Sequence, residues 1–192
     1  MALFASIDLR MTKKPEILRT ETIARTRIFR VERVDLRFSN GQEAQFERLQ
    51  TPPGGAVLIV PMLDKDTVLL IREYSAGVDR YELVLPKGRI EPNESMLDTA
   101  NRELMEEVGY AARNLRHIKS LTLAPGYANH TTHIVLAQDL YAQKLVGDEP
   151  EPIEVLPWPL AKITQLLDRD DFTEARSIAA LYIVRDQLAS AT

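Results

Sequence analysis

Three glutamates near the middle of the chain have the spacing best suited to chemistry. Glu103, Glu106 and Glu107 fall in a segment with helical periodicity. At about 100° per residue, Glu107 lies about 40° from Glu103 around the helix axis, and Glu106 lies about 60° to the other side. The three carboxylates therefore share one edge of the expected helix. Like charges so placed repel one another, and a hard divalent cation would convert that repulsion into coordination.

A run of this kind also has a simpler interpretation, a solvated acidic helix face, and the surrounding residues favour the metal site. The stretch fits the pattern Gly-x5-Glu-x7-Arg-Glu-U-x-Glu-Glu-x-Gly-U, where U is apolar. The matching residues are Gly88, Glu94, Arg102, Glu103, Leu104, Glu106, Glu107, Gly109 and Tyr110. Tyr110 is an aromatic residue where an aliphatic one is usual. This segment resembles the catalytic motif of the Nudix hydrolases.

The resemblance implies roles for these residues. Glu103, Glu106 and Glu107 would bind Mg²⁺, with Mn²⁺ as an alternative, and the Lys87 carbonyl would approach the metal. Glu106 and Glu107 would thereby be catalytic, and Gly88 would allow a tight turn. Arg102 would pair with Glu94 and hold the loop against the helix. The implied reaction is attack of water on one phosphorus of a diphosphate, assisted by the metal.

The elements that must position these groups can be read from periodicity. Ser95, with Asp98 three residues later, begins a helix whose apolar stripe is Leu97, Ala100, Leu104 and Val108, and Gly109 ends it. Strands are expected at 56–63, 67–74, 81–85, 115–124, 130–140 and 153–157, and closing helices at 159–167 and 173–188. This order predicts an α/β protein, the Nudix α/β/α sandwich with a mixed sheet.

The region before residue 53 differs from the rest. Residues 20–50 read as strands, with a hairpin turn at Ser39-Asn40-Gly41, and Pro52-Pro53-Gly54-Gly55 breaks the pattern. We expect a small N-terminal antiparallel sheet in residues 1–52 and a catalytic domain in 53–192. Because a small sheet is marginal in isolation, we also expect this region to form a two-fold homodimer, as the resemblance implies.

Residues outside the motif bear on the substrate. Pro125 stands sixteen residues beyond Gly109, where a proline resembles the mark of ADP-ribose pyrophosphatases. Tyr127 resembles the mark of enzymes that cut dinucleoside polyphosphates, although an ordinary Pro-Gly-Tyr turn is an equal alternative. Four longer stretches resemble the bacterial Nudix hydrolases of ADP compounds, namely 71–74, 100–104, 137–141 and 147–152. The resemblance implies hydrolysis of ADP-ribose, NADH and short diadenosine polyphosphates, with AMP released from ADP-ribose.

Other candidate substrate contacts are less clearly marked. Ser75 follows Glu73-Tyr74 where an arginine is common, so Arg72 and Tyr74 are the candidates nearby. Glu82 could contact substrate or be a core-edge residue bonded to backbone. Phe29 and Phe46 could stack on adenine, or simply pack the inner face of the hairpin.

The acidic loop 147–152 offers a general base. Metal-bound carboxylates accept protons poorly, so Glu149 and Glu151 are candidates, and the prolines at 150 and 152 restrict the backbone of the loop. The resemblance to ADP-ribose pyrophosphatases implies functional glutamates in such a loop. Glu151 is favoured over Glu149 because it lies nearer the expected strand, and a solvated acidic turn is the alternative.

Composition limits the classes of molecule that the chain is expected to bind. The chain has 192 residues, a formal charge of −4 and no cysteine, which argues against nucleic acid or an anionic membrane as partner and excludes thiolate chemistry. No apolar run approaches the roughly 18 residues of a membrane span, so a cytoplasmic enzyme acting on small nucleotide diphosphates is expected. Two rival functions remain: a nucleoside-triphosphate or dinucleoside-polyphosphate hydrolase, and a Nudix domain that only senses a nucleotide.

Overall fold

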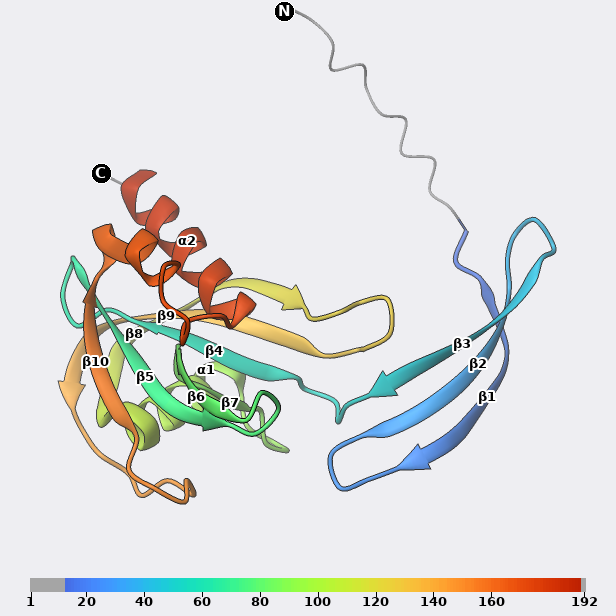
Figure 1. The fold of residues 1–192 in the computed structure, drawn as a ribbon, viewed down its shortest axis with the longest axis horizontal. Helices are drawn as coiled ribbons and strands as arrows, with labels where there is room; N and C mark the ends of the chain where they lie inside the picture. The colour runs from blue at the N-terminus through green and yellow to red at the C-terminus, as the bar shows by residue number, and fades with distance from the viewer. Residues whose placement is uncertain (1–12, 191–192) are drawn as a thin grey trace, which may run out of the picture. The chain divides into compact units, whose positions relative to one another are not determined.

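The structure, a computed structural model, describes residues 13–190 of the chain. The described residues fall into two compact units (Figure 1). The N-terminal unit contains residues 13–51 together with Ala124–Asn129, and the second unit contains Pro52–Leu123 and residues 130–190. No helix in this part of the chain is long and apolar enough to cross a membrane.

The N-terminal unit is built on an antiparallel sheet with the strand order β1-β2-β3. Its strands are β1 (Glu16–Arg25), β2 (Arg30–Arg37) and β3 (Glu43–Gln50). The predicted hairpin turn is confirmed: Gly41 has a φ of +82°, and its N–H donates to the Phe38 carbonyl at 2.9 Å. A left-handed residue at this place is what a tight hairpin requires.

The two faces of this sheet differ in chemistry. Cross-strand pairing puts Val34 opposite Phe46 and Leu36 opposite Ile17 on one face. The other face carries ion pairs such as Arg37 with Glu43 and Arg33 with Glu21. Among residues 13–51, Glu32 and Val34 alone are buried. The face with Val34 also holds Glu32, which pairs with Arg30 and Arg48. The apolar part of this face therefore has almost no core of its own.

The second unit contains two sheets. In the four-stranded sheet β7-β4-β9-β8, strands β4 and β9 are parallel and the other pairs are antiparallel, while β10-β5-β6 is wholly antiparallel. The strands are β4 (Ala56–Pro61), β5 (Thr67–Ser75), β6 (Arg80–Val84), β7 (Lys87–Arg89), β8 (Tyr110–Thr122), β9 (Thr131–Ala142) and β10 (Glu154–Pro159). The mixed sheet is as predicted.

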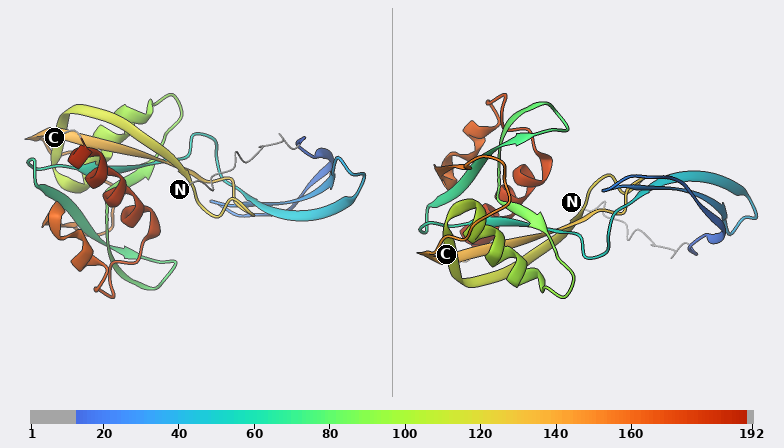
Figure 2. Two further views of the ribbon diagram at one scale, coloured as in Figure 1. Left: turned by 90° about the horizontal axis from the view of Figure 1, so that it is seen from above. Right: turned by 90° about the horizontal axis from the view of Figure 1, so that it is seen from below.

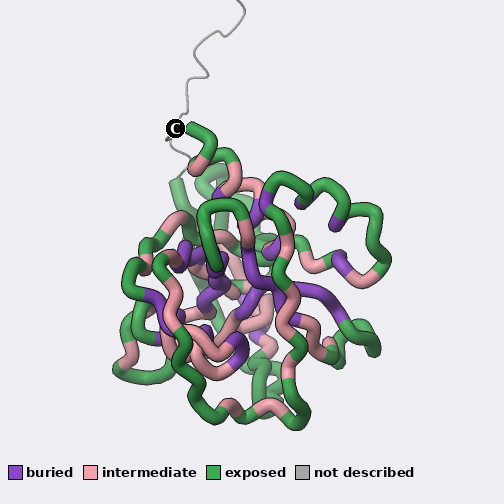
Figure 3. Tube along the Cα trace, turned by 90° about the vertical axis from the view of Figure 1, so that its left-hand side faces the viewer, coloured by how far each residue is buried: buried purple, intermediate pink, exposed green. Residues whose placement is uncertain are grey.

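Helical segments cover both faces of the four-stranded sheet (Figure 2). They are α1 (Met96–Glu103), the π-helical turn η1 (Leu104–Val108), the 3₁₀ helix η2 (Leu160–Leu166) and α2 (Ala175–Ser190). Along β4, Leu58 and Val60 pack in the cluster that includes α2, whereas Val57 and Ile59 pack in the cluster that includes α1. The central strands are accordingly buried on both faces (Figure 3). This arrangement confirms the α/β/α prediction.

Several expected elements differ in detail. The predicted helix is capped by the Ser95 side chain and ends at Gly109, whose φ is +83°, but its last turn is π-helical. Leu97, expected in the buried stripe, is 37% exposed, and the first buried residue of α1 is Thr99. The helix expected at 159–167 is a 3₁₀ helix with a kink at Lys162, and β8 begins at Tyr110 rather than at Leu115.

Candidate active site

The three glutamates of the motif line a cavity of about 580 Å³ in the second unit. Its walls come from β7, α1, η1 and the loop that follows β9. The cavity brings together the predicted residues Lys87, Glu103, Glu106, Glu107 and Glu149. Residues separated by more than sixty positions in the chain thus share one strongly acidic space.

Two of these carboxylates are buried. Glu103 is 8% exposed and Glu107 is 3% exposed. Burial raises the pKa of Glu107 to about 8 and the pKa of Glu103 to about 7, because desolvation disfavours the charged form. Placing two such groups in the wall of one cavity is unfavourable unless a positive charge compensates them.

In this structure Arg102 provides part of that compensation. Its Nη1 atom lies 2.8 Å from a Glu103 oxygen and 2.9 Å from a Glu106 oxygen. The predicted pairing with Glu94 is confirmed by hydrogen bonds of 3.0 Å from both Nε and Nη2. Arg102 therefore ties the loop to the helix, and it also contacts two of the expected metal ligands.

Gly88 lies in a different setting from the one expected. It lies in strand β7 opposite Val57 and is not among the glycines with positive φ. A Cβ atom at this position would overlap the Glu103 carboxyl group. The absence of a side chain lets that carboxylate approach the backbone of β7, and no tight turn is involved.

The donor set fits a hard divalent cation, although it is not arranged as a finished site. Among residues 13–190, no three acidic or histidine side chains converge closely enough to hold a metal. Glu103 and Glu106 face Arg102, and Glu107 accepts the Lys87 N–H at 2.9 Å. Carboxylate oxygens are the ligands that Mg²⁺ and Mn²⁺ prefer, and a cation would relieve the burial of their charge.

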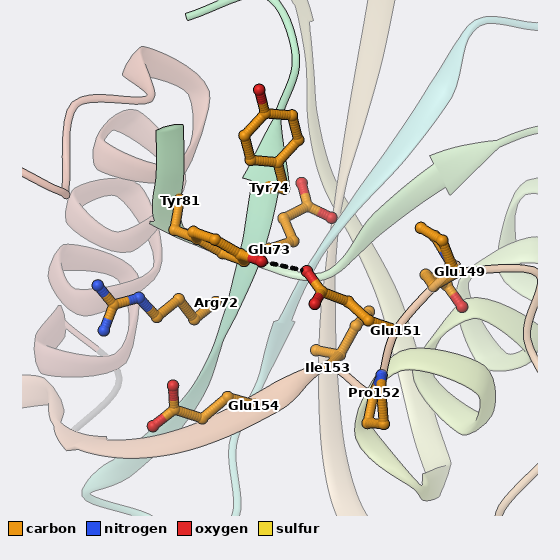
Figure 4. Close-up of a pocket in the computed structure, with 10 residues that line it drawn as sticks. Arg72, Glu73, Tyr74, Tyr81, Glu149, Glu151, Pro152, Ile153 and Glu154 are labelled. Carbon is orange, nitrogen blue, oxygen red and sulfur yellow. Dashed lines mark hydrogen bonds between the residues drawn. The ribbon is translucent and has the colours of Figure 1, made fainter. Parts of the chain in front are cut away.

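A second cavity, of about 410 Å³, shares Glu149 with the first (Figure 4). It gathers the predicted residues Arg72, Tyr74, Glu149 and Glu151. Arg72 lies 3.6 Å from Asp171, and the Tyr74 hydroxyl donates to Asp79. The cavity thus adjoins the acidic one and has aromatic rings in its walls.

The two candidate bases differ in the cavities that they line. Glu149 lines both cavities, and its charge contributes to the raised pKa of Glu103. Glu151 lines only the second cavity, where it accepts a 2.6 Å hydrogen bond from the Tyr81 hydroxyl. The placement favours Glu149 over Glu151 as the group closest to the carboxylates, in contrast to the preference derived from the sequence.

The contacts of Glu82 favour the second of its two interpretations. It is 3% exposed and accepts the Thr173 N–H at 3.2 Å. The Thr173 hydroxyl lies 3.0 Å from it, and Arg80 also pairs with it. These bonds join β6 to the segment before α2, as expected of a core-edge residue.

A third cavity, of about 360 Å³, belongs to the N-terminal unit. It brings together Phe46, Pro125 and Tyr127 from the sheet and the 124–129 loop. The Leu49 N–H donates to the Tyr127 carbonyl at 2.7 Å, which joins this loop to β3. Phe29 lies at the turn between β1 and β2 and is 42% exposed.

Tyr81 is one cavity residue that the sequence reasoning missed. It pairs directly with Tyr74 across the β5–β6 hairpin, and the two rings meet edge to face with centroids 5.6 Å apart. The hydrogen bond to Glu151 raises the pKa of the Tyr81 hydroxyl. Two tyrosines flanking the short 75–80 connection were the available signal, because a hairpin brings such residues opposite each other.

Comparison with known proteins identifies the family of the chain. Residues 15–48 match the NudE-type Nudix hydrolase N-terminal domain, and residues 52–181 match the NUDIX domain. The ADP compounds hydrolase NudE of Escherichia coli K12 is 51% identical over 92% of this chain and 94% of its own. The ADP-ribose pyrophosphatase of Bacillus subtilis is 29% identical over 85% of this chain and 91% of its own.

A solved structure described as an ADP compounds hydrolase superposes with a TM-score of 0.88 and 49% identity, covering 94% of this chain and 97% of its own. The fold, the acidic cavity and the sequence matches therefore agree, and they confirm the family predicted from residues 88–110: the chain belongs to the Nudix hydrolases.

Proposed function

We propose that this chain hydrolyses the pyrophosphate linkage of ADP compounds, namely ADP-ribose, NADH and short diadenosine polyphosphates, with Mg²⁺ as cofactor. The observation that carries the proposal is the acidic cavity, in which Glu103, Glu106 and Glu107 face the loop containing Glu149. A cavity so rich in carboxylates would repel a diphosphate by itself, so it suits a substrate that enters together with a divalent cation. NudE, a hydrolase of ADP compounds, supports the choice of substrate.

Each side chain has a defined task in this proposal. Glu103, Glu106 and Glu107 would hold the metal together with the Lys87 carbonyl, and the metal would neutralise phosphate charge and lower the pKa of bound water. Glu149 would accept the proton of the attacking water, since it lines the acidic cavity without being one of the three helix carboxylates. Arg102 would keep the loop at Glu94 against α1.

Arg72 is the proposed phosphate contact. Its guanidinium belongs to the second cavity, and its 3.6 Å contact with Asp171 leaves donors free for an incoming phosphate. With ADP-ribose the products would be AMP and ribose 5-phosphate.

We further propose that the chain works as a homodimer formed through the N-terminal unit. The apolar face around Val34 and Phe46 lacks a core of its own. The cavity lined by Phe46, Pro125 and Tyr127 offers aromatic surface, which suits an adenine ring of substrate held by the partner subunit.

Product analysis tests the function directly. The purified chain would be incubated with ADP-ribose, NADH, diadenosine triphosphate or ATP, with Mg²⁺ or with EDTA, and the products separated by chromatography. We expect Mg²⁺-dependent release of AMP from ADP-ribose and little turnover of ATP. Preference for ATP would indicate a nucleoside-triphosphate hydrolase, and binding without turnover would indicate a sensor.

A further inference from the structure

The cavity between the β5–β6 hairpin and the acidic loop has walls unlike those of the carboxylate cavity. Tyr74 and Tyr81 line it, with 49% and 45% of their surface exposed. Proline and isoleucine from residues 150–153 form the facing wall. The other five lining residues are charged, namely Arg72, Glu73, Glu149, Glu151 and Glu154. Apolar and aromatic surface with converging polar groups is typical of small-molecule sites, and about 410 Å³ lies within their usual range of roughly 300–1,000 Å³.

The two rings are held in place. The Tyr81 hydroxyl donates to Glu151 at 2.6 Å, and the Tyr74 hydroxyl donates to Asp79. The rings also support each other edge to face, and in Figure 4 Tyr81 reaches toward Glu151 on the loop. Aromatic surface that is exposed yet already fixed loses little conformational entropy when a planar ligand stacks on it.

The location of the cavity determines which part of a substrate could reach it. Glu149 forms a wall of both this cavity and the carboxylate cavity, so the two spaces adjoin at the proposed base. Arg72 lies in the same cavity and could contact a phosphate next to the cleaved bond. A group bound against the tyrosines would therefore be the portion attached to one of the two phosphates.

We propose that this cavity binds the half of the substrate that differs among ADP compounds. One ring of the Tyr74–Tyr81 pair would stack on a planar base carried by that half, and the other ring, set at 70° to the first, would contact the base by its edge. This proposal rests on the proposed function. ADP-ribose has no second base, whereas NADH and diadenosine triphosphate each have one. The tyrosines would then make the chain accept dinucleotides as well as ADP-ribose. Stacking of a base on an aromatic side chain contributes enough to change affinity about tenfold.

The test compares the ratio of kcat/KM for diadenosine triphosphate to kcat/KM for ADP-ribose. Tyr81→Leu and Tyr74→Leu should each lower this ratio about tenfold. Tyr81→Phe keeps the ring and loses the bond to Glu151, so it should change both activities by the same factor and leave the ratio unaltered. Tyr141→Leu, which removes a ring packed under Arg113 on β9, is the matched control and should leave both activities unchanged.

The outcomes distinguish the stacking role of the tyrosines from the proposed hydrolase function. Equal losses on both substrates in the two leucine variants, or a lower ratio in Tyr81→Phe, would overturn the stacking role while leaving the hydrolase intact. Failure of the wild-type chain to hydrolyse either substrate would overturn the proposed function and the stacking role together. Melting temperatures of all four variants show that each comparison is made on folded protein.

Discussion

At the residue scale, the main energetic problem is the burial of two carboxylates beside a third. Glu107 is 3% exposed and Glu103 is 8% exposed, and a single guanidinium, that of Arg102, contacts Glu103 and Glu106. The fold thus maintains an arrangement that is unfavourable in the absence of further positive charge. Such an arrangement is expected where a cation and an anionic substrate must both bind.

Glu107→Gln tests whether that unfavourable charge serves the reaction. The amide binds a cation poorly, so kcat should fall on the order of 100-fold. The variant should also melt at a higher temperature than wild type at pH 9 without metal, because a buried charge has been removed. Glu43→Gln, on exposed strand β3, is the control and should change neither quantity. Near-normal turnover in Glu107→Gln would remove the basis of the proposed site.

The prediction about the general base compares the effects of substituting two glutamates of one loop. Glu149→Gln should lower kcat about 100-fold with little change in KM, because a base acts mainly in the transition state. Glu151→Gln should have the smaller effect, since Glu151 contacts Tyr81 in the neighbouring cavity. Turnover would be measured from pH 5 to 10 for both variants. If both retain wild-type turnover across this range, the loop serves only as a lid and the base belongs to the helix.

The contacts of a residue could be predicted from the sequence where both partners belong to one local motif. Glu94 and Arg102 were paired correctly because the motif places both at the junction of one loop and one helix. The second contact of Arg102, with Glu106, and the bond from Tyr81 to Glu151 depend on side-chain orientation. Tyr81 and Glu151 are seventy residues apart, so no local pattern joins them.

At the element scale, the segment from Met96 to Val108 combines two kinds of helix. Its first two turns are α-helical, and its last turn is π-helical, with the Gly109 N–H bonded to the Leu104 carbonyl at 3.1 Å. Such turns are frequent at functional sites. The wider turn alters the angle between Glu103 and Glu107 from the value for an ideal helix. The side chains of Glu103 and Glu107 are both buried in the structure, whereas the sequence pattern predicted that they would lie at the edge of the buried stripe.

The stability of this element should depend on pH and metal. The folded pKa values of about 7 for Glu103 and about 8 for Glu107 lie above the ordinary value of about 4.3. A carboxyl group with a raised folded pKa stabilises the fold while protonated, and this contribution is lost as pH rises through the folded pKa. Without metal, the melting temperature should therefore decline between about pH 5 and pH 8.

Mg²⁺ should reverse that decline, because it binds the deprotonated carboxylates of the folded chain. Melting curves at pH 5, 7 and 9, each with EDTA or with Mg²⁺, measure the effect. The rise produced by Mg²⁺ should be largest at pH 9 and smallest at pH 5. An equal rise at all three values would show that the buried carboxylates do not bind the cation.

Elements were predicted well where strong local signals mark their ends. Ser95 and Gly109 bound the helical segment, and Gly41 forms the hairpin, because capping and left-handed residues act over a few positions. Strand β7 was missed because three residues carry no periodicity, and it exists only through pairing with β4. Sheet membership is likewise a tertiary property, so the split into two sheets could not be read from local patterns.

At the scale of the whole molecule, the N-terminal unit contrasts with the second unit. The second unit has two apolar clusters, one on each side of its central strands. The N-terminal unit has a three-stranded sheet whose buried residues among 13–51 are only Glu32 and Val34. A sheet with so little core is only marginally stable unless its apolar face is covered.

The last prediction is that a second copy of the chain provides this cover. Light scattering at micromolar concentration should give twice the chain mass of 21.7 kDa. Ile17→Lys places a charge on the apolar face at a position already 48% exposed, so it should leave each chain folded while shifting the mass toward that of one chain. Gln45→Lys, on the charged face opposite Asp35, is the matched control and should remain dimeric. Ile17 also lines the cavity proposed for adenine, so the dimer is judged in Ile17→Lys from the mass alone, while activity on ADP-ribose should stay normal in Gln45→Lys. A wild-type chain that is monomeric at this concentration and fully active would contradict both the dimer and the shared adenine site.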